Sequence, residues 1–153
     1  MKKAAQYGRI PFGLALATFV LPFMETCEFS LKGSSEPSTQ VTGVALLAGA
    51  DASGFAIDPD PWVILAFAAL LAGLAYTFAK LPWALRAPAA AAGVATLGLL
   101  VFLFTFPDRG GDWIPSLGLL LALLFSFGAG VTFLVFVIVE ARERHAAERA
   151  APP

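Results

Sequence analysis

The sequence has only one cysteine, one histidine and few charges among its 153 residues. A single cysteine excludes a disulfide within the chain and an all-cysteine metal site. The single histidine, His145, lies in the charged C-terminal segment, which leaves no histidine within an apolar stretch to bind a haem. Charged residues make up 14% and hydrophobic residues 58% of the chain, so a soluble domain of this size could not cover its apolar surface. The net charge of −1 offers no attraction for nucleic acid. These absences exclude an ordinary cytosolic enzyme, a disordered chain and a nucleic-acid-binding protein.

Four apolar stretches, at residues 10–24, 62–79, 87–106 and 113–139, contain no Asp, Glu, Lys, Arg or His. A helix needs about 20 residues to cross the roughly 30 Å hydrocarbon core of a bilayer. Stretches that are apolar on every side are typical of membrane spans. We therefore expect an all-α fold, an integral membrane four-helix bundle that forms one domain over residues 1–153. The fourth stretch is longer than a span requires, so we expect it to tilt or to carry an interfacial turn.

The basic residues predict the orientation of these spans. Eight of the ten lie before the first span, between the second and third, or after the fourth, and only Lys32 and Arg109 lie elsewhere. By the positive-inside rule both termini are cytoplasmic, with outer loops at 25–61 and 107–112 and a cytoplasmic tail at 140–153. Tryptophan is enriched at membrane interfaces. The residues expected to anchor the protein there are Trp62 and Trp113 outside and Trp83 inside.

The first outer loop is the largest segment outside the spans. Polar and apolar residues alternate at 27–32, and a second short stretch at 40–44 follows a turn rich in Gly and Ser, so we expect a small β-hairpin there. Loops often display function, and Cys27, Thr42 and Gly43 form the candidate outer-loop site. A solvated connector is the alternative interpretation of this loop.

The residues before Cys27 also resemble a secretory signal, since a basic stretch is followed by a short apolar run. Cleavage before Cys27 would leave a lipidated cysteine and three spans. Met24 and Glu25 are poor residues for such a cleavage site, so we expect the first helix to be retained. The topology of the later spans is the same in both cases.

The run Leu21-Pro22-Phe23-Met24-Glu25-Thr26-Cys27, followed by Thr42-Gly43 and an apolar stretch, resembles a class of small bacterial four-helix membrane proteins. In that class a first helix ending in Pro-Phe is followed by a cysteine and a Thr-Gly loop. Thr26 stands where that pattern often has Ser. The resemblance implies a location in the bacterial inner (plasma) membrane. It implies no catalytic residue.

The fourth span has a small residue at every fourth position. Lipid provides no hydrophobic drive for helix association, so small residues that allow close approach favour packing. The predicted helix-packing seam consists of Gly118, Ala122, Ser126 and Gly130. It either closes the bundle internally or faces another subunit, and replacing Gly118 or Gly130 by Leu is expected to weaken assembly.

No catalytic, cofactor-binding or metal-binding residue is predicted. The leading hypothesis is a non-enzymatic accessory or interaction subunit of a larger membrane assembly, in contact with the lipid bilayer and with a membrane protein partner or a second copy. One alternative is a small oligomeric pore or transporter. Another is a redox subunit that holds a quinone or pigment between aromatic side chains of the third and fourth spans. These are Phe102, Phe104, Phe106, Phe125 and Phe127.

Overall fold

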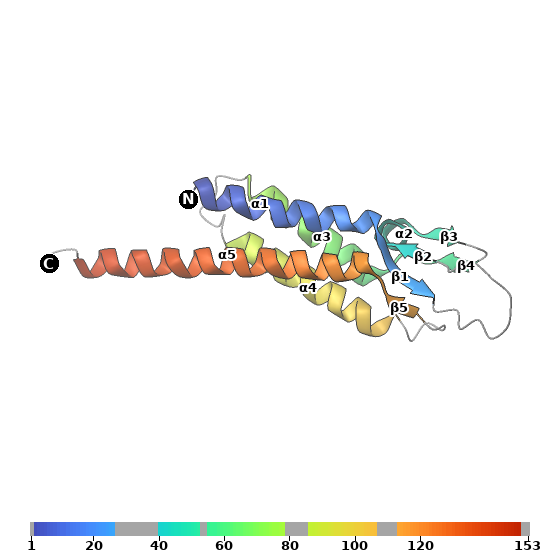
Figure 1. Ribbon diagram of the computed structural model, residues 1–153. Coiled ribbons are helices and arrows are strands. Elements are labelled where there is room, and N and C mark those ends of the chain that lie inside the picture. The colour runs from blue at the N-terminus through green and yellow to red at the C-terminus, as the bar shows by residue number, and fades with distance from the viewer. Residues whose placement is uncertain (1, 27–39, 53–54, 79–85, 107–112, 151–153) are drawn as a thin grey trace.

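A computed structural model describes residues 2–26, 40–52, 55–78, 86–106 and 113–150. Within these ranges the chain is mostly helical, and four long helices lie side by side (Figure 1). They are α1 (Lys2–Ala17), α3 (Pro61–Tyr76), α4 (Arg86–Thr105) and α5 (Leu117–Ala150). Helix α1 packs against α3 and α5, and α4 packs against the same two helices, so the four form a ring. Helices that are adjacent in the ring run in opposite directions (Figure 1).

The interior of the ring is filled by aromatic and small apolar side chains. The rings of Phe12 on α1 and Phe133 on α5 lie 5.9 Å apart, and both side chains are buried. On α3 and α4 the buried positions include Leu70 and Leu99. Small residues bring α3 close to α4, since a Cβ at Gly98 would lie 3.0 Å from the Trp62 carbonyl oxygen.

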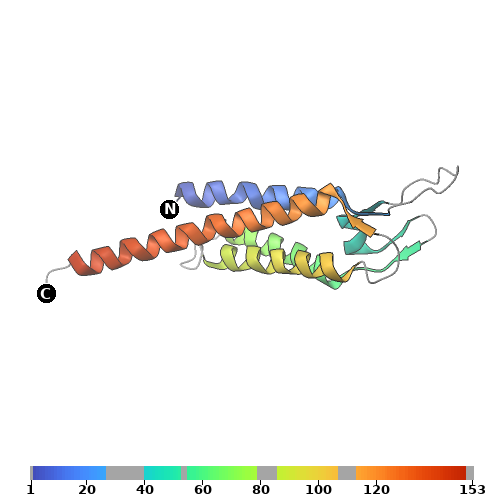
Figure 2. The same ribbon diagram turned by 60° about the horizontal axis from the view of Figure 1, so that its bottom comes forward.

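A small amount of β-structure covers one end of the bundle, which we call the sheet end (Figures 1 and 2). Strand β1 (Pro22–Thr26) pairs antiparallel with β2 (Gln40–Thr42) on one side and with β5 (Trp113–Pro115) on the other. The remaining elements here are a 3₁₀ turn η1 (Thr18–Val20), helix α2 (Gly43–Ala48) and the hairpin of β3 (Ala50–Ala52) with β4 (Phe55–Ile57). The opposite end, where α5 continues past the other helices, is called the tail end.

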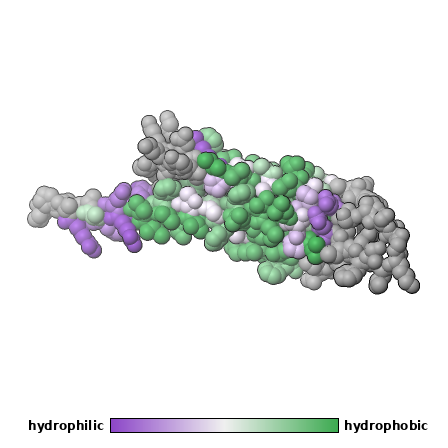
Figure 3. All heavy atoms as spheres, viewed as in Figure 1, coloured by the Kyte–Doolittle hydropathy of each residue, from purple (hydrophilic) through white to green (hydrophobic). Residues whose placement is uncertain are grey.

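Two of the helices in the described ranges are long and apolar enough to cross a membrane. These are α4, over Arg86–Thr105, and α5, over Leu117–Ala146. Helix α3 and the Arg9–Val20 stretch are apolar but shorter. Figure 3 shows a broad hydrophobic band over the middle of the molecule, with hydrophilic side chains gathered near the two ends.

The helices differ from the expected spans at the sheet end. The first span was expected to reach residue 24, but α1 ends at Ala17 and a 3₁₀ turn and β1 follow it. The fourth was expected to start at residue 113, but residues 113–115 form β5 and the helix starts at Leu117. An X-Pro pair lies at both places, and the residue before a proline favours an extended conformation. The pairs are Leu21-Pro22, where Leu21 is extended with ψ 159°, and Ile114-Pro115.

The expected hairpin is described only in part. Residues 40–42 form a strand, as expected, and it pairs with β1. The predicted partner, residues 27–32, lies outside the described part of the chain. The second strand ends at Thr42 because α2 begins at Gly43. Strand β5 and the β3–β4 hairpin were not predicted.

Candidate functional site

One carboxylate connects three segments at the sheet end. Glu25 Oε1, on β1, accepts a hydrogen bond from Gln40 Nε2 on β2 at 3.1 Å and one from Ser116 Oγ at 3.0 Å. Ser116 also donates its backbone N–H to the Phe23 carbonyl at 2.9 Å. Because Ser116 directly precedes α5, Glu25 joins the start of that helix to the sheet.

Thr42 and Gly43, from the candidate outer-loop site, lie together at the start of α2. Thr42 Oγ1 accepts a hydrogen bond from the Ala45 N–H at 3.2 Å, as an N-cap residue does. Gly43 is buried, and a Cβ there would lie 2.9 Å from both the Cα and the carbonyl oxygen of Phe19. The Thr-Gly pair therefore starts α2 and lets it pack closely on the 3₁₀ turn. Cys27 lies outside the described residues.

A buried carboxylate starts α3. Asp60 is fully buried, and its Oδ1 accepts hydrogen bonds from the N–H groups of Trp62 at 2.9 Å and Val63 at 3.2 Å. Pro61 occupies the first helical position, where a missing N–H has no cost. An Asp-Pro pair before an apolar run is a helix-start signal, so this cap was detectable in the sequence.

The structure describes two of the three tryptophans that were expected at the membrane interfaces. Trp62 lies in the first turn of α3 at the sheet end and is 39% exposed. Trp113 lies in β5 at the same end, and Trp83 lies outside the described residues.

An arginine joins α1 to α3 near the tail end. Arg9 Nη2 donates to the Thr77 carbonyl oxygen at 3.0 Å, and its guanidinium carbon lies 3.9 Å from the centre of the Phe78 ring. A cation is favoured at the C-terminus of a helix, where carbonyl groups lack helical partners. Arg9 was expected only to orient the first span, because its partners are far away in the sequence.

The first part of the predicted seam packs against β1. A Cβ on Gly118 would overlap the Pro22 carbonyl oxygen and would lie 2.8 Å from the Leu21 Cβ. Ala122, one turn later, is fully buried. A larger residue at Gly118 would therefore act first on the fold of this chain.

The second part of the seam faces α4. Ser126 is fully buried, donates to the Leu123 carbonyl at 3.1 Å and lies 3.2 Å from Thr96 Oγ1. A Cβ at Gly130 would lie 3.5 Å from the Ala92 Cβ, which is ordinary contact. These contacts are all within the chain.

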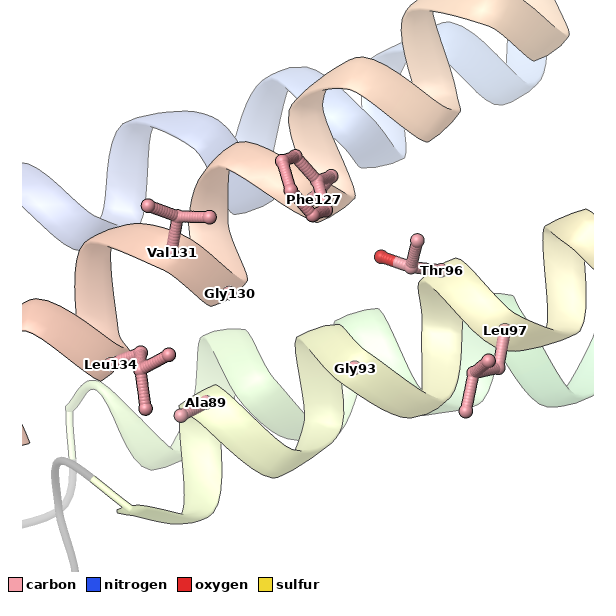
Figure 4. A pocket seen from close by; sticks show the side chains of 8 residues that line it. All are labelled: Ala89, Gly93, Thr96, Leu97, Phe127, Gly130, Val131 and Leu134. Atoms are coloured by element: carbon pink, nitrogen blue, oxygen red, sulfur yellow. The ribbon is translucent and has the colours of Figure 1, made fainter.

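An open groove runs between α4 and α5 (Figure 4). It has a volume of about 320 Å³. Its larger apolar side chains are Leu97, Phe127, Val131 and Leu134, and Gly93 and Gly130 leave it open between the helices. A Cβ at Gly93 would meet no atom within 4 Å. The groove was not predicted, because an apolar surface of this kind has no charge or motif to mark it.

The phenylalanines considered for a quinone or pigment do not gather around one cavity. Phe102 and Phe106 are buried and contact each other, with ring centres 4.9 Å apart. Phe104 is 75% exposed on another face of α4. Phe127 lies in the groove, and Phe125 packs partly buried against the core.

The last turns of α5 extend beyond the bundle at the tail end (Figures 1 and 2). Arg142, His145 and Arg149 are exposed and, with Ala146, line a shallow hollow on one face. On another face Arg144 forms an ion pair with Glu140. We call residues 140–150 the tail helix, and we call Arg142, His145 and Arg149 its basic face.

Among the described residues, no group of three or more His, Cys, Asp or Glu is placed to hold a metal ion. Comparisons of this chain with protein-family models, with curated proteins and with solved structures find no match.

Proposed function

We propose that this chain is a non-enzymatic, four-span protein of the bacterial inner membrane that serves as an accessory or interaction subunit of a larger membrane assembly. In this proposal the sheet end faces outward and the tail end, with both termini, faces the cytoplasm. The distribution of basic residues supports this orientation. The resemblance of residues 10–50 to small bacterial four-helix membrane proteins supports the location.

The exposed apolar surface supports membrane insertion. Large apolar side chains in the middle of the bundle are open to the surroundings, among them Leu97 (63%), Leu124 (61%) and Phe127 (62%). Patches of this extent are rare on soluble monomers and mark contact with lipid or protein. The apolar stretches of the first and second spans, Arg9–Val20 and Pro61–Tyr76, have 12 and 16 residues, about 18 and 24 Å at 1.5 Å per residue. Their lengths fall short of the hydrocarbon core, so in this proposal their flanking residues complete the crossing.

The tail helix is the observation that carries the accessory function. At 1.5 Å per residue, the 34 residues of α5 extend about 51 Å, against roughly 30 Å for the hydrocarbon core. About 20 Å of helix would therefore stand in the cytoplasm. A short isolated helix is marginally stable in water, and this one exposes Arg142 and Arg149 on a single face. A protein partner with an acidic surface would stabilise the helix and match that charge.

Native mass spectrometry after gentle release from the cell's own membranes tests the proposal. The full chain is expected to carry a protein partner, and a chain ending at Ala141 is expected to lose it while it stays in the membrane fraction. Arg142→Glu combined with Arg149→Glu should have the same effect, because it reverses the charge of the basic face. Arg144→Glu is the matched control on the other face, and it should retain the partner.

A full chain that is released only as a monomer or homo-oligomer would contradict the accessory function. In that case solute flux through vesicles that contain only this protein would test the pore or transporter alternative.

A further inference from the structure

The groove between α4 and α5 presents mostly apolar surface to an occupant. Thr96 is its one polar lining side chain, and its hydroxyl already donates to the Ala92 carbonyl at 2.8 Å and lies 3.2 Å from Ser126 Oγ. The volume of about 320 Å³ is many times the roughly 30 Å³ that one water occupies. An extended hydrocarbon chain is therefore a better match to the groove than water or a polar ligand.

The same groove has positive charge at its tail end. Arg86 lies one turn before Ala89, the lining residue nearest the start of α4. On α5, Arg142 follows Val131 by eleven residues, which is three helical turns and places both on one face. Arg86 therefore lies close to the tail end of the groove, and Arg142 lies eight residues beyond Leu134, about 12 Å farther along α5. An apolar channel with arginines beyond one end is complementary to a molecule with an apolar chain and an anionic head.

We propose that this groove is a binding site for one anionic phospholipid of the cytoplasmic leaflet. An acyl chain lies along Leu97, Phe127 and Leu134, and the head-group phosphate lies near Arg86 and Arg142. The inference rests on the membrane location and orientation given under the proposed function, but not on the accessory role. Anionic lipids are enriched in the cytoplasmic leaflet, and basic pockets between spans bind their head groups.

The size of the groove favours a lipid chain over a helix of a partner protein. A helix about 10 Å in diameter occupies roughly 420 Å³ in each 5.4 Å turn. The groove extends along α4 from Ala89 to Leu97, a distance of about 12 Å at 1.5 Å per residue. A helix over that length has more than twice the volume of the groove, so it could lie across the mouth of the groove but not within it. A single acyl chain is thin enough to lie within it.

The test uses the full chain reconstituted in vesicles of equal parts phosphatidylcholine and phosphatidylglycerol, followed by native mass spectrometry of retained lipid. The wild-type protein should retain one phosphatidylglycerol in preference to phosphatidylcholine. Gly93→Leu should abolish this retention, because the added side chain fills the groove and meets no protein atom within 4 Å at its Cβ. Gly13→Leu is the matched control, since Gly13 is also exposed with open space around it but lies on α1.

Arg86→Gln and Arg142→Gln provide a second pair of variants that leave the apolar channel intact. Each should lower the preference for phosphatidylglycerol about fivefold, the effect expected for one basic residue near the membrane surface. Equal retention of the two lipids by the wild-type protein, or unchanged phosphatidylglycerol retention in Gly93→Leu, would overturn the proposal. If Gly93→Leu loses a protein partner but retains as much lipid as the wild type, the groove instead binds a helix of that partner. Failure of the accessory role would appear separately, as a wild-type protein that binds the lipid but carries no partner.

Discussion

Replacement of Gly43 by Ala should destabilise the sheet end without changing any charge. Gly43 is not in the left-handed region, where Gly49 lies with φ 75°, so an alanine there meets no backbone strain. The cost is steric. The new Cβ would lie 2.9 Å from the Cα and the carbonyl oxygen of Phe19 and 2.9 Å from Phe23 Cε1. Carbon atoms normally contact at about 3.5–4.0 Å, and two of these three atoms belong to the backbone and cannot rotate away.

Overpacking of this kind costs about 1–3 kcal/mol. We expect a loss of that size in the free energy of unfolding, measured by far-ultraviolet circular dichroism as SDS is added to protein in a mild detergent. Gly13→Ala is the matched control. Its Cβ would meet nothing within 4 Å, so it should leave stability unchanged or raise it by up to about 1 kcal/mol. The steric argument is refuted if Gly43→Ala is as stable as the wild type in this assay.

Three further contacts can be tested by the same unfolding measurement. Asp60→Ala removes the cap of α3 and should cost about 1–2 kcal/mol, and Asp60→Asn, which keeps an acceptor oxygen, should lose less; equal losses would contradict the capping role. A double-mutant cycle with Glu25→Ala and Ser116→Ala should give a coupling energy of about 1 kcal/mol, and additive losses would show that the two side chains act independently. Gly118→Ala should cost about 1–3 kcal/mol because its Cβ overlaps the Pro22 carbonyl, and a stable Gly118→Ala protein with altered oligomeric state would place this residue at a subunit interface instead.

The sequence predicts the two middle helices closely and the sheet end poorly. The expected stretches 62–79 and 87–106 lie within three residues of α3 and α4 at each end, because uninterrupted apolar composition marks a long helix directly. Strand β1 pairs with β5, about 90 residues later in the chain. Strand β5 and the first three residues of β1 lie inside apolar runs, so alternation does not distinguish them from helix.

The candidate site, like the fold, is only partly predictable from the sequence. Thr42 and Gly43 are noticeable in the sequence, but their role in starting α2 depends on the position of Phe19. The hydrogen bonds of Glu25 with Gln40 and Ser116 depend on strand pairing that local patterns do not determine. The groove depends on how far α4 and α5 separate around Gly93 and Gly130. Such features arise from packing between distant segments, whereas composition reports only the environment of each segment.

The orientation of the chain in the membrane is the central claim, and cysteine labelling tests it most directly. In a Cys27→Ser background, Asp58→Cys places a thiol at an exposed position of the sheet end and Arg149→Cys places one on the exposed tail helix. A membrane-impermeant maleimide added to intact spheroplasts should label Asp58→Cys, and it should label Arg149→Cys only after the membrane is permeabilised. Labelling of both thiols from outside, or protection of both until permeabilisation, would contradict the proposed topology.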